Sequence, residues 1–176
     1  MEEYKQISSK EVYNGKIMKV YSEEIVLPNG KTAVREVVRK ASAAAVLPID
    51  EDGKAILVRQ YRHPINAMTF EIPAGIIDKF EDAQACAKRE TAEEIGYLPQ
   101  SLTYICSYYG SIGFCNELCH VYIGENLIKT DQDLDEEEFI TTHKYTIKEC
   151  QKMIESQEIC DAKTILAILA YINMKE

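Results

Sequence analysis

Short apolar runs that end at turn residues dominate the first two thirds of the chain. Proline fixes φ and glycine tolerates positive φ, so Pro28-Asn29-Gly30 between two extended segments predicts a β-hairpin. Runs of four to eight apolar or β-branched residues between such turns are typical of strands. The pattern predicts strands at Glu24–Leu27, Thr32–Val38, Ala43–Ile49, Lys54–Gln60, Leu102–Tyr109 and Leu118–Gly124.

Helical periodicity appears in three longer segments. These are Asp82–Ile95, Ile147–Glu155 and Ala162–Asn173, the last with Asp161 as its N-cap. Strands surround helices in mixed order, without the regular alternation of a parallel doubly wound sheet. The pattern therefore predicts an α+β fold, and no internal repeat or long linker divides the 176 residues.

Composition narrows the function class. The formal net charge is -9, which argues against a nucleic-acid or membrane-surface binder, since such proteins display basic patches. The first residues lack a basic region followed by an apolar run, so we expect no secretory signal. The longest apolar stretch, 165–172, is too short to cross a bilayer. We expect no membrane partner and a cytoplasmic location.

Six cysteines are scattered through apolar segments without a C-x-x-C pair. This usage is typical of buried free thiols in a reducing compartment. Cys115, Cys119 and His120 would be the starting point of a zinc site, but no fourth ligand is evident.

The strongest chemical signal is a set of seven polar or glycine positions at fixed spacings: Gly75, Glu81, Arg89, Glu90, Glu93, Glu94 and Gly96. On a helix, Glu90 and Glu94 lie on the same face, one turn apart. Like charges so placed repel each other unless a cation lies between them. Carboxylates together with phosphate oxygens are typical Mg²⁺ ligands, so the cluster predicts a metal site. The alternative is a solvated acidic helix face.

At these positions the chain resembles the Nudix hydrolases, whose signature combines the same glycines, glutamates and Arg-Glu pair. Two apolar positions of the signature differ, because Thr91 and Tyr97 replace aliphatic residues. Neither is a ligand position. The methyl group of Thr91 can pack in a core, so we interpret it as a packing variant.

The resemblance extends over nearly the whole chain and implies the Nudix fold, a mixed β-sheet in an α/β/α sandwich. It implies a division into an N-terminal antiparallel β extension at 1–40 and a Nudix hydrolase domain at 41–176. In relatives that act on ADP-ribose, the extension makes dimer contacts. A homodimer is therefore expected.

Carried over by position, the resemblance implies Mg²⁺ as cofactor, with Mn²⁺ as an alternative. The metal ligands would be the carbonyl of Ala74 and the carboxylates of Glu90 and Glu94. Glu93 would help to bind a further ion and take part in catalysis.

The resemblance also implies how the reaction is catalysed. Arg89 would support catalysis by orienting Glu81 and offsetting the negative charge. In this subgroup a glutamate on a later loop accepts the proton of the attacking water. Glu138 aligns best with that position, and Glu136 and Glu137 are close rivals.

Two segments indicate the substrate class. The first, 59–62 with 71–75, resembles the same region of ADP-ribose and nucleoside-diphosphate-sugar pyrophosphatases. There Arg62 would bind phosphate and Glu71 would pair with an arginine at the pocket mouth. The second is the loop 111–117, where Ser111 and Glu117 are candidate substrate contacts.

Ile112 stands where that subgroup usually has a proline that marks ADP-ribose specificity. The resemblance implies a metal-dependent pyrophosphohydrolase that converts ADP-ribose to AMP and ribose 5-phosphate, or cleaves a related nucleoside-diphosphate sugar. Another nucleotide sugar or a modified nucleotide is the alternative substrate. A non-catalytic nucleotide-sensing module is the alternative class, and the intact Glu90, Glu93 and Glu94 argue against it.

Overall fold

The computed structural model describes residues 3–175, which form two compact units. The smaller unit contains the described residues up to Ser42 together with Tyr108–Leu118, and the larger contains Ala43–Ser107 and the chain from Cys119 onward. The division predicted from the sequence at residue 40 assigns the segment 108–118 to the larger part. The compact units group this segment with the N-terminal strands, because Val38 bridges to Cys115 and forms backbone hydrogen bonds with Phe114 and Asn116. The predicted domain boundary at residue 40 stays a prediction.

The smaller unit is built on an antiparallel three-stranded sheet in the order β1 (Lys5–Asn14), β2 (Lys19–Val26) and β3 (Thr32–Arg39). The predicted hairpin is confirmed. Gly30 adopts φ +79°, and its N–H donates to the Leu27 carbonyl to close the turn.

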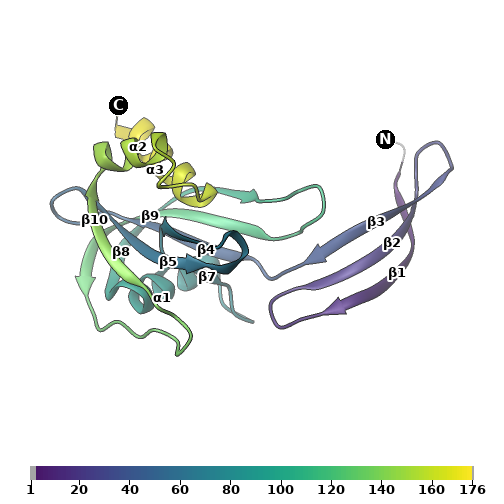
Figure 1. Cartoon of the computed structure of the whole chain (residues 1–176), viewed down its shortest axis with the longest axis horizontal. Helices are drawn as coiled ribbons and strands as arrows, with labels where there is room; N and C mark the ends of the chain where they lie inside the picture. The colour runs from purple at the N-terminus through teal and green to yellow at the C-terminus, as the bar shows by residue number, and fades with distance from the viewer. Residues whose placement is uncertain (1–2, 176) are drawn as a thin grey trace. The chain divides into compact units, whose positions relative to one another are not determined.

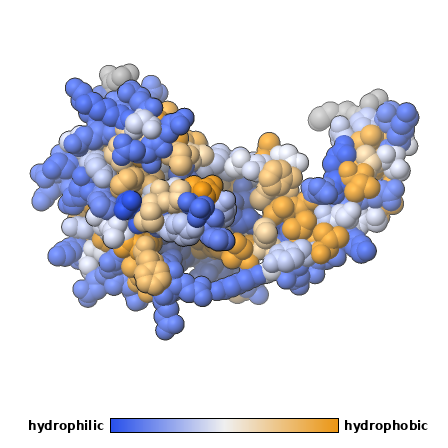
Figure 2. All heavy atoms as spheres, in the orientation of Figure 1, coloured by the Kyte–Doolittle hydropathy of each residue, from blue (hydrophilic) through white to orange (hydrophobic). Residues whose placement is uncertain are grey.

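Much of the apolar surface of this sheet is exposed. All ten positions of β1 are exposed, and hydrophobic side chains lie on the surface of these strands (Figure 2). Ile7 is 52% exposed and Val34 is 62% exposed. A three-stranded sheet is stable only when one apolar face is covered. The exposed apolar residues therefore favour contact with a partner surface.

The larger unit contains one mixed sheet and one antiparallel sheet. One has the order β7-β4-β9-β8 and the other the order β10-β5-β6. β4 runs antiparallel to β7 and parallel to β9. The strands are β4 (Ala43–Pro48), β5 (Lys54–Arg62), β6 (Ala67–Glu71), β7 (Ala74–Ile76), β8 (Tyr97–Tyr109), β9 (Leu118–Lys129) and β10 (Thr141–Thr146), with a 3₁₀ turn at His63–Ile65.

Three helices cover these strands, as predicted: α1 (Ala83–Ile95), α2 (Ile147–Glu155) and α3 (Ala162–Lys175). The strands of the larger unit lie between α1 and the α2–α3 pair (Figure 1). This arrangement agrees with the predicted α+β fold. No helix within residues 3–175 has the length and apolar character needed to cross a membrane.

Local sequence explains where the helices begin and end. The Asp82 carboxylate caps α1 by accepting the Ala85 N–H, and Gly96 ends the helix with φ +68°. Asp161 accepts the backbone N–H of Thr164 at 3.1 Å, which confirms its predicted capping role. Caps of this kind fix the first residues of α1 and α3 relative to the strands that precede them.

Small side chains allow α1 to pack closely on β4. Ala44 and Val46 form a buried cluster with Cys86 and Ala87 of the helix. Thr91 is fully buried and donates to the Ala87 carbonyl at 2.6 Å, so it packs inside the core. This packing fixes the height of the helix above the sheet, and with it the position of the glutamates farther along α1.

Candidate active site

Glu90 lies directly over Gly75 of β7. A Cβ atom added to Gly75 would lie 1.9 Å from the Glu90 Cδ, a distance at which one group must move. The φ angle of Gly75 is not in the left-handed region. Glycine is therefore required here because the carboxylate approaches the backbone closely, and the strand and α1 together form a cradle for Glu90.

We predict that Gly75→Ala displaces the Glu90 carboxylate. The variant should lose metal affinity by about tenfold or more while it stays folded, because the displaced group is the far end of a flexible side chain. Calorimetric titration with Mg²⁺ and a thermal melt check this. Gly110→Ala is the matched control, since a Cβ at Gly110 meets nothing within 4 Å. Unchanged metal affinity in Gly75→Ala would contradict the assignment of Glu90.

Arg89 connects the glutamates of the motif. Its guanidinium donates to Glu81 at 2.9 and 3.0 Å, to Glu90 at 2.7 Å and to Glu93 at 2.9 Å. The salt bridges expected of Arg89 are thus present. Hydrogen bonding from Arg89 is the main cause that holds the pKa of Glu81 at about 2, well below its usual value. Arg89 therefore orients three carboxylates and offsets part of their charge.

Glu94 is the most unusual carboxylate of the site. It is 4% exposed, and its Oε2 has no hydrogen-bond partner. Burial first, and then the charges of Glu90 and Glu138, raise the pKa of Glu94 to about 8, although the Ala74 backbone N–H bonds to it. A buried carboxylate with a free oxygen is costly unless a cation or a proton occupies it.

The donor set fits a hard divalent cation. Within residues 3–175, no three acidic, histidine or cysteine side chains already converge on one point. Mg²⁺ does not need such a cage, because it is usually held by one or two carboxylates together with water and substrate phosphates. The free oxygen of Glu94 and the cradled Glu90, whose pKa burial also raises, supply these carboxylates.

Glu138 lies on the loop between β9 and β10, as predicted. Its charge raises the pKa of both Glu90 and Glu94, so its carboxylate is within electrostatic reach of the two candidate ligands. The Asp135 N–H donates to the Glu138 side chain at 3.2 Å. A carboxylate so placed is a candidate proton acceptor beside Glu90 and Glu94.

Arg62 and Glu71 form a bidentate ion pair on the neighbouring sheet. Both nitrogen–oxygen distances are 2.7 Å, and Glu71 is 2% exposed. Lys163 of α3 donates to Glu71 at 2.6 Å and lies 3.0 Å from Asp161. The arginine partner expected for Glu71 is therefore Arg62. The sequence placed Lys163 only in the segment that caps the last helix and did not predict its contact with Glu71.

We predict a pH-dependent contribution of Glu71 to stability. Its pKa is lowered from 4.5 to about 2, because bonds from Arg62 and Lys163 outweigh burial. Such a group stabilises the fold at pH values above its unfolded pKa. This stabilisation is lost as the pH falls through the folded pKa. Glu71→Gln should lower the free energy of unfolding by on the order of 3 kcal/mol at pH 7, and by about half of that at pH 3.

Urea unfolding of both proteins at the two pH values measures this difference. The exposed Glu36→Gln is the control and should unfold like the wild type at either pH. An equal loss at pH 7 and pH 3 would show that the Glu71 charge is not the stabilising element.

Ser111 and Glu117 belong to the smaller unit. The Ser111 carbonyl accepts the N–H groups of Phe114 and Cys115, which makes this segment a tight turn. Glu117 forms an ion pair with Lys40, and Ile112 is 81% exposed. Substrate contacts by Ser111 and Glu117 stay predictions.

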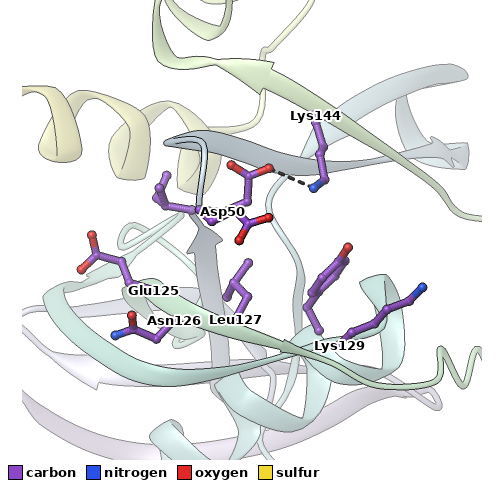
Figure 3. Close-up of a pocket in the computed structure, with 9 residues that line it drawn as sticks. Asp50, Glu125, Asn126, Leu127, Lys129 and Lys144 are labelled. Atoms are coloured by element: carbon purple, nitrogen blue, oxygen red, sulfur yellow. Dashed lines mark hydrogen bonds and ion pairs between the residues drawn. The ribbon is translucent and has the colours of Figure 1, made fainter.

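A cavity of about 610 Å³ opens elsewhere in the larger unit, beside the Asp50–Lys144 ion pair (Figure 3). Strand β9 contributes Glu125, Asn126, Leu127 and Lys129 to its lining. None of the predicted site residues lines it.

Sequence similarity to known proteins covers nearly the whole chain. The model of the NUDIX domain matches residues 39–164. The chain belongs to the Nudix family. The model of the nucleoside diphosphate sugar hydrolase N-terminal domain matches residues 4–38, directly before the Nudix match. Nudix hydrolases use divalent metal ions, which agrees with the carboxylates described above.

Similar proteins agree with this assignment of a Nudix hydrolase. An ADP-ribose pyrophosphatase of Bacillus subtilis is 40% identical, over 99% of this chain and 95% of that protein. A methanol dehydrogenase activator of Bacillus methanolicus is 36% identical, over the same shares of the two chains. A crystal structure of an ADP compounds hydrolase matches with a TM-score of 0.86 and 20% identity, covering 97% of this chain and 93% of the other, and it confirms the Nudix fold.

Proposed function

We propose that this Nudix hydrolase is a Mg²⁺-dependent pyrophosphohydrolase of ADP-ribose or a related nucleoside-diphosphate sugar. The observation that carries the proposal is the buried carboxylate of Glu94, whose free Oε2 lies in the same acidic site as the cradled Glu90. The 40% identity with an ADP-ribose pyrophosphatase supports the substrate class. The products would be AMP and ribose 5-phosphate.

Each residue of the site has a part in this reaction. The Ala74 carbonyl, Glu90 and Glu94 would hold the metal, with Glu93 assisting a further ion. A divalent ion held there would neutralise charge on the diphosphate and would lower the pKa of the attacking water. Arg89 keeps the glutamates in place through its hydrogen bonds.

The remaining steps use groups at the edge of the site. Glu138 accepts a proton from the attacking water, whose oxygen bonds to phosphorus as the bridging phosphorus–oxygen bond breaks. The leaving phosphate takes up the displaced electron pair. Arg62, whose side chain is 44% exposed, would donate hydrogen bonds to the diphosphate oxygens.

A substrate panel tests the proposal. The pure protein with Mg²⁺ is incubated with ADP-ribose, ADP-glucose, UDP-glucose, GDP-mannose, NADH and 8-oxo-dGTP, and products are identified by chromatography. The highest kcat/KM on ADP-ribose, with AMP released, is the expected result. A higher value on another compound would reassign the substrate in the direction that Ile112 suggests. No hydrolysis of any of the six compounds would favour a non-catalytic sensing module. Repeating the assay with Mn²⁺ identifies the preferred metal.

A homodimer in the cytoplasm is part of the same proposal. The exposed apolar side chains of β1 and β3, such as Ile7 and Val34, support a partner surface on the N-terminal unit. Light scattering coupled to size-exclusion chromatography should give the mass of two chains. A mass of one chain at micromolar concentration would contradict the dimer.

A second candidate role is activation of a dehydrogenase by the same hydrolytic site. The 36% identity with a methanol dehydrogenase activator over 99% of the chain favours testing it. An NAD-dependent alcohol dehydrogenase assayed with and without the protein provides the test. Activation that disappears in a Glu94→Gln variant would support this role, and no activation would exclude that enzyme as a partner.

A further inference from the structure

Glu71 is the centre of a buried polar network at the end of β6. Its carboxylate accepts two bonds from Arg62 at 2.7 Å, one from Lys163 at 2.6 Å and one from the Thr69 hydroxyl at 2.6 Å. Lys163 is largely buried, with 13% of its side chain exposed, whereas 44% of the Arg62 side chain is exposed. The network thus has a buried end on α3 and an exposed end at Arg62.

The network lies beside the carboxylates of the candidate metal site. Hydrogen bonding to Glu71 is the main cause that raises the pKa of Arg62, and the charge of Glu94 adds to it. The charge of Lys163 offsets a small part of the burial that raises the pKa of Glu94. The segment after Glu71 leads directly to Ala74, and the Ile72 N–H is held by the Thr164 hydroxyl at 2.9 Å. The first turn of α3 therefore holds both the Glu71 side chain and the backbone that continues into the site.

Stability alone does not explain the choice of charged residues here. Replacing a buried ion pair by apolar residues of similar size is often neutral or stabilising, because taking charges out of water is costly. An apolar residue at position 163 and an uncharged polar capping residue at position 161 would still allow the helix to form. What the charges add is a fixed orientation of the Glu71 carboxylate, and through it of the Arg62 guanidinium.

We propose that Lys163 is a positioning residue that acts through Glu71 to present Arg62 to the substrate diphosphate. The inference rests on the proposed function, and it assigns to Glu71 an indirect role in substrate binding. With Lys163 present, the Glu71 carboxylate accepts hydrogen bonds from both Lys163 and Arg62, and the Arg62 guanidinium has one orientation. Without it, the carboxylate swings and the arginine loses its fixed geometry.

The test compares Lys163→Met, Lys163→Arg and Ile168→Val. Lys163→Met should raise KM for the preferred substrate by about tenfold while kcat changes little, and Lys163→Arg should restore most of the loss. Ile168→Val is the structural control, since it removes one buried methylene from the same helix and changes no polar group. It should lower Tm without moving KM.

A double-mutant cycle shows whether Lys163 acts through Arg62. In an Arg62→Ala background, Lys163→Met should cause no further rise in KM. Full additivity of the two changes would overturn the proposal. So would a KM shift in Ile168→Val equal to that in Lys163→Met, because it would reveal a merely structural role.

Binding of inorganic pyrophosphate with Mg²⁺ separates this inference from the proposed function. If the wild type hydrolyses none of the panel, the proposed function fails. Calorimetry with pyrophosphate still tests the positioning role, where Lys163→Met should weaken binding about tenfold and Lys163→Arg should not. Equal affinity in wild type and Lys163→Met would overturn the inference whatever the substrate.

Discussion

Glu94→Gln should lower turnover by about three orders of magnitude or more, while the protein stays folded. The amide keeps the volume of the side chain but is a much weaker ligand for a hard cation than a carboxylate. In the wild type, the pKa of Glu94 is raised to about 8, chiefly by burial. Near pH 7 the folded, metal-free carboxyl therefore holds a proton that it would release on unfolding, which costs stability. A neutral amide has no such cost, so the metal-free variant should melt at the same temperature as the wild type or higher.

The measurements are kcat/KM on the preferred nucleotide sugar, Mg²⁺ affinity by calorimetry, and Tm without metal. Glu155→Gln on α2 is the control, because it makes the same chemical change at an exposed helix position. Two results would contradict the assignment. Unchanged turnover would remove Glu94 from the metal site, and loss of folding would indicate that its carboxylate has a structural role instead.

Glu138→Gln should lower kcat by about a hundredfold or more, with little change in KM or Mg²⁺ affinity. The amide cannot accept the proton of the attacking water, and Glu138 is not placed among the metal ligands. The pH dependence of kcat provides a second readout. The variant should lose the acidic limb of the wild-type profile, because that limb reports protonation of the base.

The neighbouring Glu136→Gln and Glu137→Gln are matched controls on the same loop. Each should change kcat by less than Glu138→Gln, since Glu138 is the residue whose charge acts on Glu90 and Glu94. A larger loss in either control would transfer the role of base to that residue. This comparison settles the ambiguity that three consecutive glutamates leave in the sequence.

Local sequence predicted the elements that carry strong local signals. The hairpin around Gly30 and all three helices are present, and α2 has the predicted bounds Ile147–Glu155. These elements depend on a cap, a turn residue or a helical periodicity, all of which lie within a few residues of each other. The same locality explains why Asp161 could be recognised as a cap.

Strands β1, β6, β7 and β10 were not predicted. β7 has only the three residues Ala74–Ile76, and its strand conformation depends on pairing with β4. β10 alternates between exposed and partly buried residues and pairs with β5, far away in the sequence. Such strands exist because a distant edge offers hydrogen bonds, and a short sequence window does not contain that information.

The sequence by itself determined the family, the α+β class and the residues of the motif, because fixed spacings on one helix are a local property. Only the tertiary structure decided that Gly75 leaves space for Glu90, that Glu94 is buried with a free oxygen, and that Lys163 reaches Glu71 across 92 positions. It also decided that the segment 108–118 belongs with the N-terminal strands. The reason is physical: desolvation, close approach and the sharing of a buried carboxylate depend on which distant segments pack together, and packing is a property of the whole chain.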